Sequence, residues 1–301
     1  MTLNARGRTI KFPRRPLIMG IVNINTDSFS DDGSLDINRA IQLARDQIAA
    51  GADIIDVGGE SAGTNRTAIS TEEEINRTTP FFERFEEAYH GLCPVDTLQV
   101  FPPLLSINTW RSPVAEMAFK AGIHLLNDMS ALPTDDNAII AARHNAALLI
   151  MHSVGQPKQK HTHIQYKNIL DTLDEFFERK IKQATKAGLS LDSIVLDPGI
   201  DFAKQKEDNL RIYQQLARLT QFERPILLAV SRKTVIHDVL GIQNAADRDA
   251  GTIACVVAGM HRGASIFRVH NVRAVSQVLR VIYPVIQRNG NFIKTNEISQ
   301  R

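Results

Sequence analysis

The sequence has few cysteines, little net charge and no long apolar run, and each shortage excludes a class of protein. Its 301 residues hold only Cys93 and Cys255, which give neither a disulfide framework nor the spacing of a metal site. A formal net charge of +2 does not indicate a nucleic-acid or membrane surface. Apolar runs such as 253–259 are far shorter than the ~20 residues of a membrane span. We therefore expect no nucleic-acid partner and no membrane partner.

The N-terminal segment is basic but lacks the apolar stretch of a signal peptide. Residues 1–16 carry five basic side chains: Arg6, Arg8, Lys11, Arg14 and Arg15. A secretory signal places an apolar region directly after its basic region, and none follows here. Together with the low cysteine content, this predicts a cytoplasmic protein in a reducing compartment.

Short apolar, β-branched runs alternate with helical patterns along the chain. Apolar residues three and four positions apart mark helices, for example over 37–51, 112–122, 169–188 and 207–219. Several of these helices end in a glycine just before the next apolar run, where glycine supplies the positive φ of a helix end. The eight expected strands are Leu17–Val22, Asp53–Val57, Pro103–Ile107, His124–Leu126, Ala147–Met151, Ser193–Leu196, Pro225–Val230 and Ala264–Val269.

Eight strand-then-helix units predict an α/β protein with a single (β/α)8 TIM barrel. Continuous apolar strands are typical of a parallel sheet that is covered on both faces. The competing doubly wound sheet has fewer strands and a glycine-rich turn after its first strand, where this chain reads NINTDSFSDDG (23–33). We therefore predict one barrel domain over residues 1–301, with an N-terminal extension at 1–15 and a C-terminal tail at 289–301.

Polar residues stand at the end of every expected strand, and a barrel concentrates its chemistry at those ends. Arg268 and His270 alternate on one strand, so they point the same way and suit an anion, with Lys233 as a further cation. Asp197 offers two acceptors to a ligand with parallel N–H donors. The sequence thus predicts a pocket for a phosphorylated or otherwise anionic ligand. The strand-end residues are Asn23, Asp56, Asn108, Asn127, His152, Asp197, Ser231, Lys233, Arg268 and His270.

Structural roles compete with function at some of these positions. Asp56 precedes a Gly-Gly turn and can cap the next helix. Asn127 and Asp128 are common turn formers. A lone histidine such as His152 is more often a buried, hydrogen-bonded group than a catalyst. Because His152 and His270 lack neighbours at ligand spacing, we expect no metal cluster of histidines and carboxylates.

Seven segments resemble the successive motifs of the dihydropteroate synthases, a family of pterin-binding barrels. In the family's order they run from about Pro16 to Ile286. The resemblance implies a transferase that condenses 6-hydroxymethyl-7,8-dihydropterin pyrophosphate with p-aminobenzoate in folate synthesis, with Mg²⁺ as cofactor and a homodimer as assembly. The segments are MGIVNINTDSFSDDG (19–33), DIIDVGGES (53–61), LLNDMS (125–130), LIMHSV (149–154), IVLDPGIDFAK (194–204), LLAVSRK (227–233) and FRVHNV (267–272).

The resemblance also implies a role for each matching residue. Asn23 stands at the Mg²⁺–pyrophosphate group. The catalytic group is Lys233, Asp197, Arg268 and His270. The dihydropterin pyrophosphate is bound by Asn108, Asn127, Asp197, Lys233, Arg268 and His270. The p-aminobenzoate side is formed by Asp27, Ser28, Phe29, Phe202 and Ser231. This agrees with the chemistry, because the leaving pyrophosphate needs cations while the aniline nitrogen needs positioning.

Three departures from the family's motifs fall in functional places. The third strand reads SINT, with Asn108 where the family has an aspartate. The second loop reads GGESAGTN, with Ala62 and Gly63 in place of a threonine and an arginine. The first loop reads NINTDSF, with Asn25 and Thr26 in place of Thr-Pro.

These departures leave more than one function open. Asn108 keeps a hydrogen-bond acceptor but supplies no negative charge, which predicts a loss of ~1–2 kcal/mol at the transition state, or about 5- to 30-fold in rate. One hypothesis is a working synthase with altered p-aminobenzoate-side loops. Another is a pterin-binding paralogue without p-aminobenzoate-dependent turnover. A corrinoid-dependent methyltransferase domain is a third, but it gives the cations Arg268 and His270 no purpose.

Overall fold

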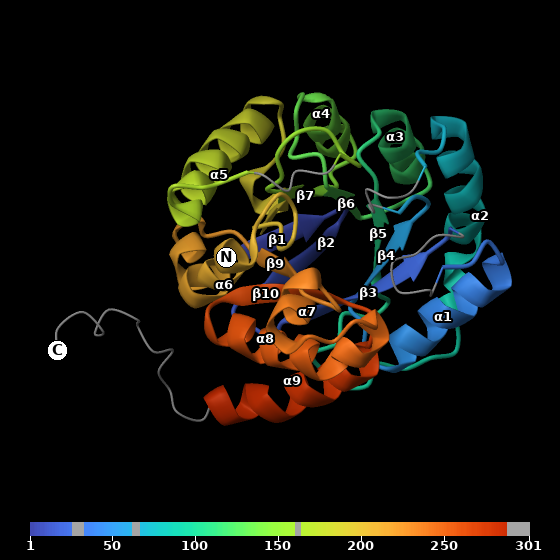
Figure 1. The fold of residues 1–301 in the computed structure, drawn as a ribbon. Helices are drawn as coiled ribbons and strands as arrows, with labels where there is room; N and C mark the ends of the chain where they lie inside the picture. Colours follow the sequence, from blue (N-terminus) through green and yellow to red (C-terminus); the bar gives the residue numbers. More distant parts are fainter. Residues whose placement is uncertain (26–32, 62–66, 160–163, 288–301) are drawn as a thin grey trace.

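Eight parallel strands close into a barrel in the computed structural model of the protein, with helices around the outside (Figure 1). The structure describes residues 1–25, 33–61, 67–159 and 164–287. Each barrel strand pairs with its neighbour in the chain, and the last strand pairs with the first to close the ring. The predicted single (β/α)8 barrel is confirmed. The predicted tail at 289–301 lies outside the described residues.

The strands and helices follow one another in the expected order. The barrel strands are β3 (Leu17–Asn23), β4 (Ile54–Gly58), β5 (Leu104–Asn108), β6 (Leu125–Asp128), β7 (Ala147–Met151), β8 (Ile194–Asp197), β9 (Ile226–Ala229) and β10 (Ala264–Val269). The helices are α1 (Ile37–Ala49), α2 (Thr71–Tyr89), α3 (Ser112–Lys120), α4 (Asp136–Arg143), α5 (Ile169–Lys186), α6 (Lys206–Gln215), α7 (Thr234–Leu240), α8 (Asp249–His261) and α9 (Val272–Gln287). The 3-10 helices among the described residues are η1 (Leu191–Ser193), η2 (Leu216–Phe222) and η3 (Ala245–Arg248).

The inward face of the strands changes from apolar to polar along the barrel axis. Side chains alternate between the two faces of a strand, so every second residue points into the barrel. On β5, Leu104 belongs to the apolar cluster inside the barrel, Ser106 bonds to a buried carboxylate, and Asn108 lines a pocket. On β10, Ile266 and Arg268 repeat this change. The apolar strand 104–108 therefore ends on an amide because its last inward position belongs to the polar end of the barrel.

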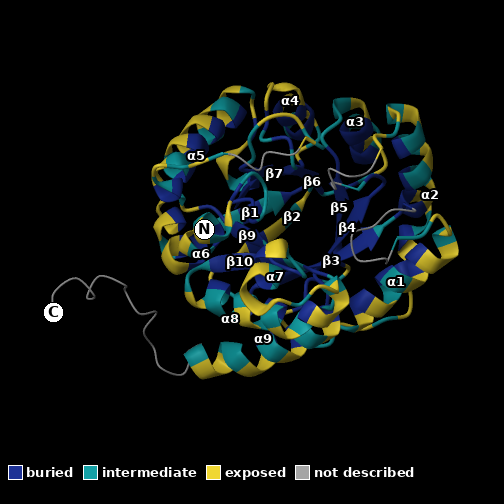
Figure 2. Cartoon of the chain, in the orientation of Figure 1, coloured by how far each residue is buried: buried dark blue, intermediate teal, exposed yellow. Residues whose placement is uncertain are grey.

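The helices bury one face against the strands and expose the other, as Figure 2 shows by the dark and yellow stripes around the ring. The helix expected over 207–219 is α6, which gives way to η2 from Leu216. No helix among the described residues is long and apolar enough to cross a membrane. The glycines that follow α1, α3, α5 and α8 have φ of +108°, +97°, +95° and +96°, which confirms their role at helix ends; they are Gly51, Gly122, Gly188 and Gly263.

The N-terminal extension folds as a hairpin against the barrel. Strands β1 (Thr2–Ala5) and β2 (Arg8–Lys11) pair antiparallel. Leu3 and Ile10 are buried in the same apolar cluster as Leu104 and the other inward residues of the lower barrel. The hairpin therefore covers the apolar end of the barrel, opposite the pocket, and appears within the ring of strands in Figure 1. Its strands are too short for the periodicity of the sequence to reveal them.

A buried ion pair joins the segment that follows this hairpin to the barrel. Arg15 is 2% exposed, and its guanidinium donates to both carboxylate oxygens of Asp53 at 3.1 and 3.2 Å. Asp53 also accepts from the backbone amides of Ile18 and Val100, both at 2.8 Å. Arg15, one of the five basic residues near the start of the chain, is thus part of the fold rather than of a charged surface.

Candidate active site

One pocket at the carboxyl ends of the strands gathers the predicted site residues that the structure describes. It is lined by residues from all eight strand ends, and these include both hydrogen-bond acceptors and cationic side chains. Asp27, Ser28, Phe29, Ala62 and Gly63 lie outside the described residues. The predicted residues in the pocket lining are Asn23, Asn108, Asn127, Asp197, Phe202, Ser231, Lys233, Arg268 and His270.

Asp56 lies fully buried beside this pocket and organises it from below. Its carboxylate accepts from Ser106 Oγ at 2.6 Å, from Asn127 Nδ2 at 2.9 Å and from Arg268 Nε at 2.7 Å. It caps no helix in the described part of the chain, so the alternative of a helix cap is wrong. The reason is the strand alternation, which points Asp56 into the barrel, where only inward residues of other strands can supply its donors.

The amides Asn108 and Asn127 present hydrogen-bond acceptors to a ligand. The two residues are register neighbours on β5 and β6. Asn127 must turn its NH₂ group toward the carboxylate of Asp56, which directs its carbonyl oxygen away from Asp56. Asn108 Oδ1 is buried and has no donor in the described part of the chain. Because buried polar atoms are almost always paired, this oxygen is suited to an N–H donor of a bound molecule.

Asp197 places a buried carboxylate at the end of β8, two strands on from β6. Its Oδ1 accepts from the backbone amide of Gly199 at 2.7 Å. Burial raises the pKa of Asp197, while the Gly199 amide and Lys233 act in the other direction. Gly199 has φ of +70°, and a Cβ there would lie 2.0 Å from the carbonyl oxygen of His152, so only glycine fits this turn.

Lys233 extends over an aromatic ring toward the carboxylates. Its Nζ lies 4.5 Å from the ring centroid of Phe202 and donates to the carbonyl of Ile200 at 3.1 Å. Burial lowers the pKa of Lys233, and the carboxylates of Asp201 and Asp197 oppose that shift. The ammonium group is therefore held by opposite charges inside the pocket.

Arg268 and His270 both line the pocket, as their alternation on β10 predicted. Arg268 is anchored through Nε to Asp56, and His270 Nδ1 lies 2.8 Å from Ser231 Oγ. Ser231, predicted for the p-aminobenzoate side, thus also orients His270. The two side chains thus offer a positive charge and a ring nitrogen from the same strand.

His152 takes a structural place next to the site. It is buried, its Nδ1 lies 2.9 Å from Lys204 Nζ, and it does not line the pocket. Burial and the adjacent Lys204 lower the pKa of His152 to about 2, and burial lowers the pKa of Lys204 to about 7. This matches the interpretation of His152 as a buried, hydrogen-bonded group.

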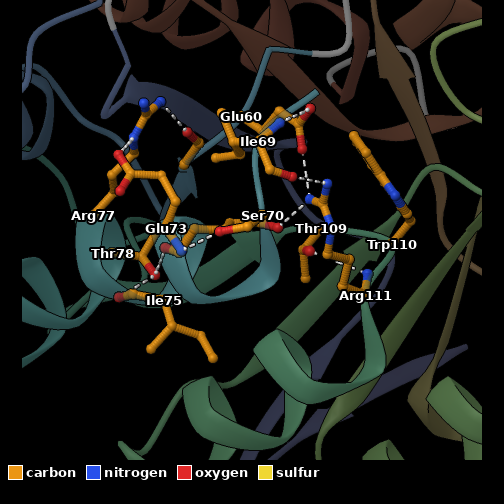
Figure 3. Close-up of polar contacts among 12 residues, drawn as sticks. Glu60, Ile69, Ser70, Glu73, Ile75, Arg77, Thr78, Thr109, Trp110 and Arg111 are labelled. Atoms are coloured by element: carbon orange, nitrogen blue, oxygen red, sulfur yellow. Dashed lines mark hydrogen bonds and ion pairs between the residues drawn. The ribbon is translucent and has the colours of Figure 1, made fainter. Parts of the chain in front are cut away.

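A network of charged side chains holds the rim of the pocket (Figure 3). Arg111, from the loop after β5, bonds to the carboxylates of Glu60 and Glu74 and to the carbonyl of Ile69. Lys158 reaches Glu60 from the loop after β7 at 2.8 Å. Glu60 lines the pocket, so this network joins three loops around one wall.

Sequence reasoning gave no role to Glu60 or Asp201, although both line the pocket. Glu60 follows the Gly-Gly turn after β4, and an acid directly behind a strand end was a usable signal. Asp201 lies in the loop after β8, three residues from Lys204, and nothing in the local spacing marks it. Its contact with α7 can be recognised only in the folded structure, where that helix lies beside the loop.

A barrel mouth that combines buried amide and carboxylate acceptors with cationic side chains fits a pterin-binding barrel enzyme. The family described as "Pterin binding enzyme" matches residues 19–270. A dihydropteroate synthase from Bacillus subtilis strain 168 is 33% identical over 291 residues, which cover 96% of this chain and 95% of that protein.

Solved structures agree with this match. The dihydropteroate synthase of Yersinia pestis with a sulfonamide drug superposes with a TM-score of 0.85 at 31% identity, covering 96% of this chain and 100% of that one. The enzyme of Thermus thermophilus in complex with 6HMPPP gives a TM-score of 0.78 at 29% identity, covering 95% and 100%. The chain belongs to the dihydropteroate synthase family of transferases.

Proposed function

We propose that the protein condenses 6-hydroxymethyl-7,8-dihydropterin pyrophosphate with p-aminobenzoate, giving 7,8-dihydropteroate and pyrophosphate. The observation that carries the proposal is the division of one pocket into acceptors and cations. Acceptors (Asn108, Asn127 and Asp197) suit the N–H edge of a pterin, and cations or donors (Arg268 and His270) suit a pyrophosphate. Membership of the family supports the same reaction.

The pocket residues act by binding and orientation. Asp197, Asn108 and Asn127 fix the pterin so that its methylene carbon faces the second substrate. The carbon–oxygen bond breaks with its electron pair leaving on pyrophosphate, whose growing charge Arg268 and His270 stabilise. The amine nitrogen of p-aminobenzoate forms the new bond to carbon and loses one proton to solvent. No dedicated general base is needed, because the positioned amine is already a nucleophile.

We propose Asn23 as the protein ligand of a Mg²⁺ ion. Asn23 lines the pocket, and its amide oxygen lies 3.6 Å from the position that a Cβ on Gly58 would take. Mg²⁺ prefers oxygen ligands and is commonly held by one or two protein groups together with substrate phosphates and water, so this residue fits the ion. Bound Mg²⁺ would supply positive charge against the leaving pyrophosphate.

Phe202 and Ser231 form the described part of the proposed p-aminobenzoate side. Phe202 offers an aromatic face beside Lys233, and Ser231 lies next to His270. The proposal also includes Asp27, Ser28 and Phe29, which lie outside the described residues.

We also propose a cytoplasmic homodimer. The two cysteines are unpaired in the structure, in keeping with a reducing compartment. On α9, Val281 and Val285 are 69% and 61% exposed, and on α7, Val239 and Leu240 are also exposed. A second copy of the chain would bury such apolar side chains. Light scattering after size-exclusion chromatography tests the dimer, and a monomer at micromolar concentration would contradict it.

The reaction itself is tested by pyrophosphate release. With dihydropterin pyrophosphate and Mg²⁺, we expect release that depends on p-aminobenzoate and produces dihydropteroate, detected by mass spectrometry. Binding of the pterin without p-aminobenzoate-dependent release would instead establish the alternative of a paralogue that has lost the condensation.

Asn108→Asp is expected to raise turnover about 5- to 30-fold, because a carboxylate stabilises positive charge on the pterin better than an amide does. Turnover is measured at saturating substrates. Asn168→Asp is the matched control, since Asn168 caps α5 away from the pocket and aspartate caps a helix equally well. Turnover that falls or stays constant in Asn108→Asp would show that Asn108 is no handicap in this pocket.

A further inference from the structure

We propose that Asp201 is a positioning residue of this pocket: it ties the loop after β8 to the start of α7 and thereby fixes Lys233 and Phe202. The contacts that carry the proposal belong to the structure alone. Only its kinetic consequences rest on the proposed function.

The contacts of Asp201 join three elements. Its backbone amide donates to Asn209 Oδ1 at 3.0 Å, and Asn209 Nδ2 returns a bond to its carboxylate at 3.0 Å, which ties the loop to α6. The same carboxylate accepts from the backbone amides of Thr234 at 2.5 Å and Val235 at 3.2 Å, in the first turn of α7. Since Lys233 directly precedes that turn, Asp201 sets the place of its backbone.

The backbone at Asp201 is in the left-handed region, with φ of +67°, and Ala203 follows at +53°. Glycine, asparagine and aspartate tolerate this region, but alanine is strained there, so the surrounding bonds must hold the conformation at Ala203. Phe202 lies between these two residues. Its carbonyl accepts from Lys204 at 3.0 Å, and the carbonyl of Ala203 accepts from Tyr166 at 2.9 Å. The aromatic wall of the pocket is therefore held by a compact, anchored loop.

Asp201 also acts on Lys233 through its charge. Burial lowers the pKa of Lys233, and the negative charge of Asp201 has the largest opposing effect, followed by that of Asp197. The positive charge of Arg268 lowers the pKa further. Burial raises the pKa of Asp201 itself, and Lys233 and the α7 amides oppose that shift. The other titratable groups that interact with Asp201 are Asp238 on α7, Lys204 in its own loop, Tyr213 on α6 and Cys255 on α8.

Two substitutions separate the charge from the anchoring. Asp201→Asn tolerates the positive φ and keeps an acceptor for the α7 amides, but removes the charge. Asp201→Gly also tolerates the φ, and removes both charge and acceptor. Removing the charge lowers the pKa of Lys233, so its ammonium group is lost at lower pH.

The first readout is direct titration of Lys233. Each protein is labelled with acetic anhydride across a pH series, and acetylation of the peptide that contains Lys233 is measured by mass spectrometry. We expect both variants to shift the midpoint of Lys233 labelling down by about one pH unit. The alkaline limit of dihydropterin pyrophosphate binding is expected to move the same way.

The second readout is steady-state kinetics with p-aminobenzoate. Asp201→Gly is expected to raise the KM for p-aminobenzoate at least about tenfold, because the Phe202 loop loses its bonds to α7, whereas Asp201→Asn retains a KM near that of the parent. Asp171→Asn is the control, since it removes an exposed carboxylate from α5 that does not line the pocket. It is expected to change neither readout.

An unchanged Lys233 midpoint in Asp201→Asn, with the fold intact by circular dichroism, would overturn the proposal. Equal p-aminobenzoate KM in all variants would overturn the anchoring of Phe202. A shifted Lys233 midpoint in a chain whose parent shows no condensation would support the role of Asp201 and refute the proposed function instead.

Discussion

Asp56→Ala is expected to lower the free energy of unfolding by about 3–5 kcal/mol, measured by urea denaturation. The substitution deprives Ser106, Asn127 and Arg268 of their shared acceptor in a fully buried position. The largest part of the loss comes from Arg268, whose guanidinium would be left inside the barrel without a carboxylate. Removing one member of a buried pair is costly because the other charge stays desolvated.

Asp171→Ala provides the control for this measurement. Asp171 pairs with Arg218 on the surface, where both side chains are substantially exposed, and such pairs contribute less than about 1 kcal/mol. A double variant, Asp56→Ala with Arg268→Met, is expected to be less destabilised than the sum of its parts, because no unpaired charge remains. Additive effects would mean that the pair is not coupled.

Arg268→Ala is expected to weaken binding of dihydropterin pyrophosphate at least about 30-fold, measured by isothermal titration calorimetry. Arg268 is the cation that β10 delivers to the pocket, and its Nε bond to Asp56 fixes its direction. The same variant is expected to bind 6-hydroxymethyl-7,8-dihydropterin, which lacks the pyrophosphate, with nearly unchanged affinity. The difference between the two ligands isolates the anion contact.

Arg143→Ala serves as the control, since Arg143 is 61% exposed on α4 and does not line the pocket. Equal losses for both ligands in Arg268→Ala would indicate general disruption of the pocket rather than a lost anion contact. Arg268→Lys is expected to recover part of the affinity, because it keeps the charge but not the planar fork of the guanidinium.

Much of the architecture followed from local pattern. Parallel barrel strands are buried on both faces, so runs such as Leu104–Ile107 are apolar with little interruption and stand out from the helices. Once eight such runs are counted, the topology brings the strand ends together. This is why Asn127, Asp197 and Arg268 could be placed in one pocket although the chain separates them widely.

The remaining features depend on contacts between distant residues. Asp56 and Arg268 are 212 positions apart, and the sequence around Asp56 is equally compatible with a helix cap. The carboxylate of Asp201 accepts hydrogen bonds from the amides of Thr234 and Val235, and no local spacing in the sequence predicts these contacts. The hairpin at the start of the chain is stabilised by burial against the barrel rather than by its own periodicity.

That hairpin also determines from which end ligands enter and leave the barrel. Because Leu3 and Ile10 fill one end, the barrel is closed there, and a molecule that enters from the pocket side must leave from the same side. The amides of Asn108 and Asn127 are buried deep in this pocket. Under the proposed function, the pterin therefore binds before p-aminobenzoate, and the product must be released before another pterin can reach these amides.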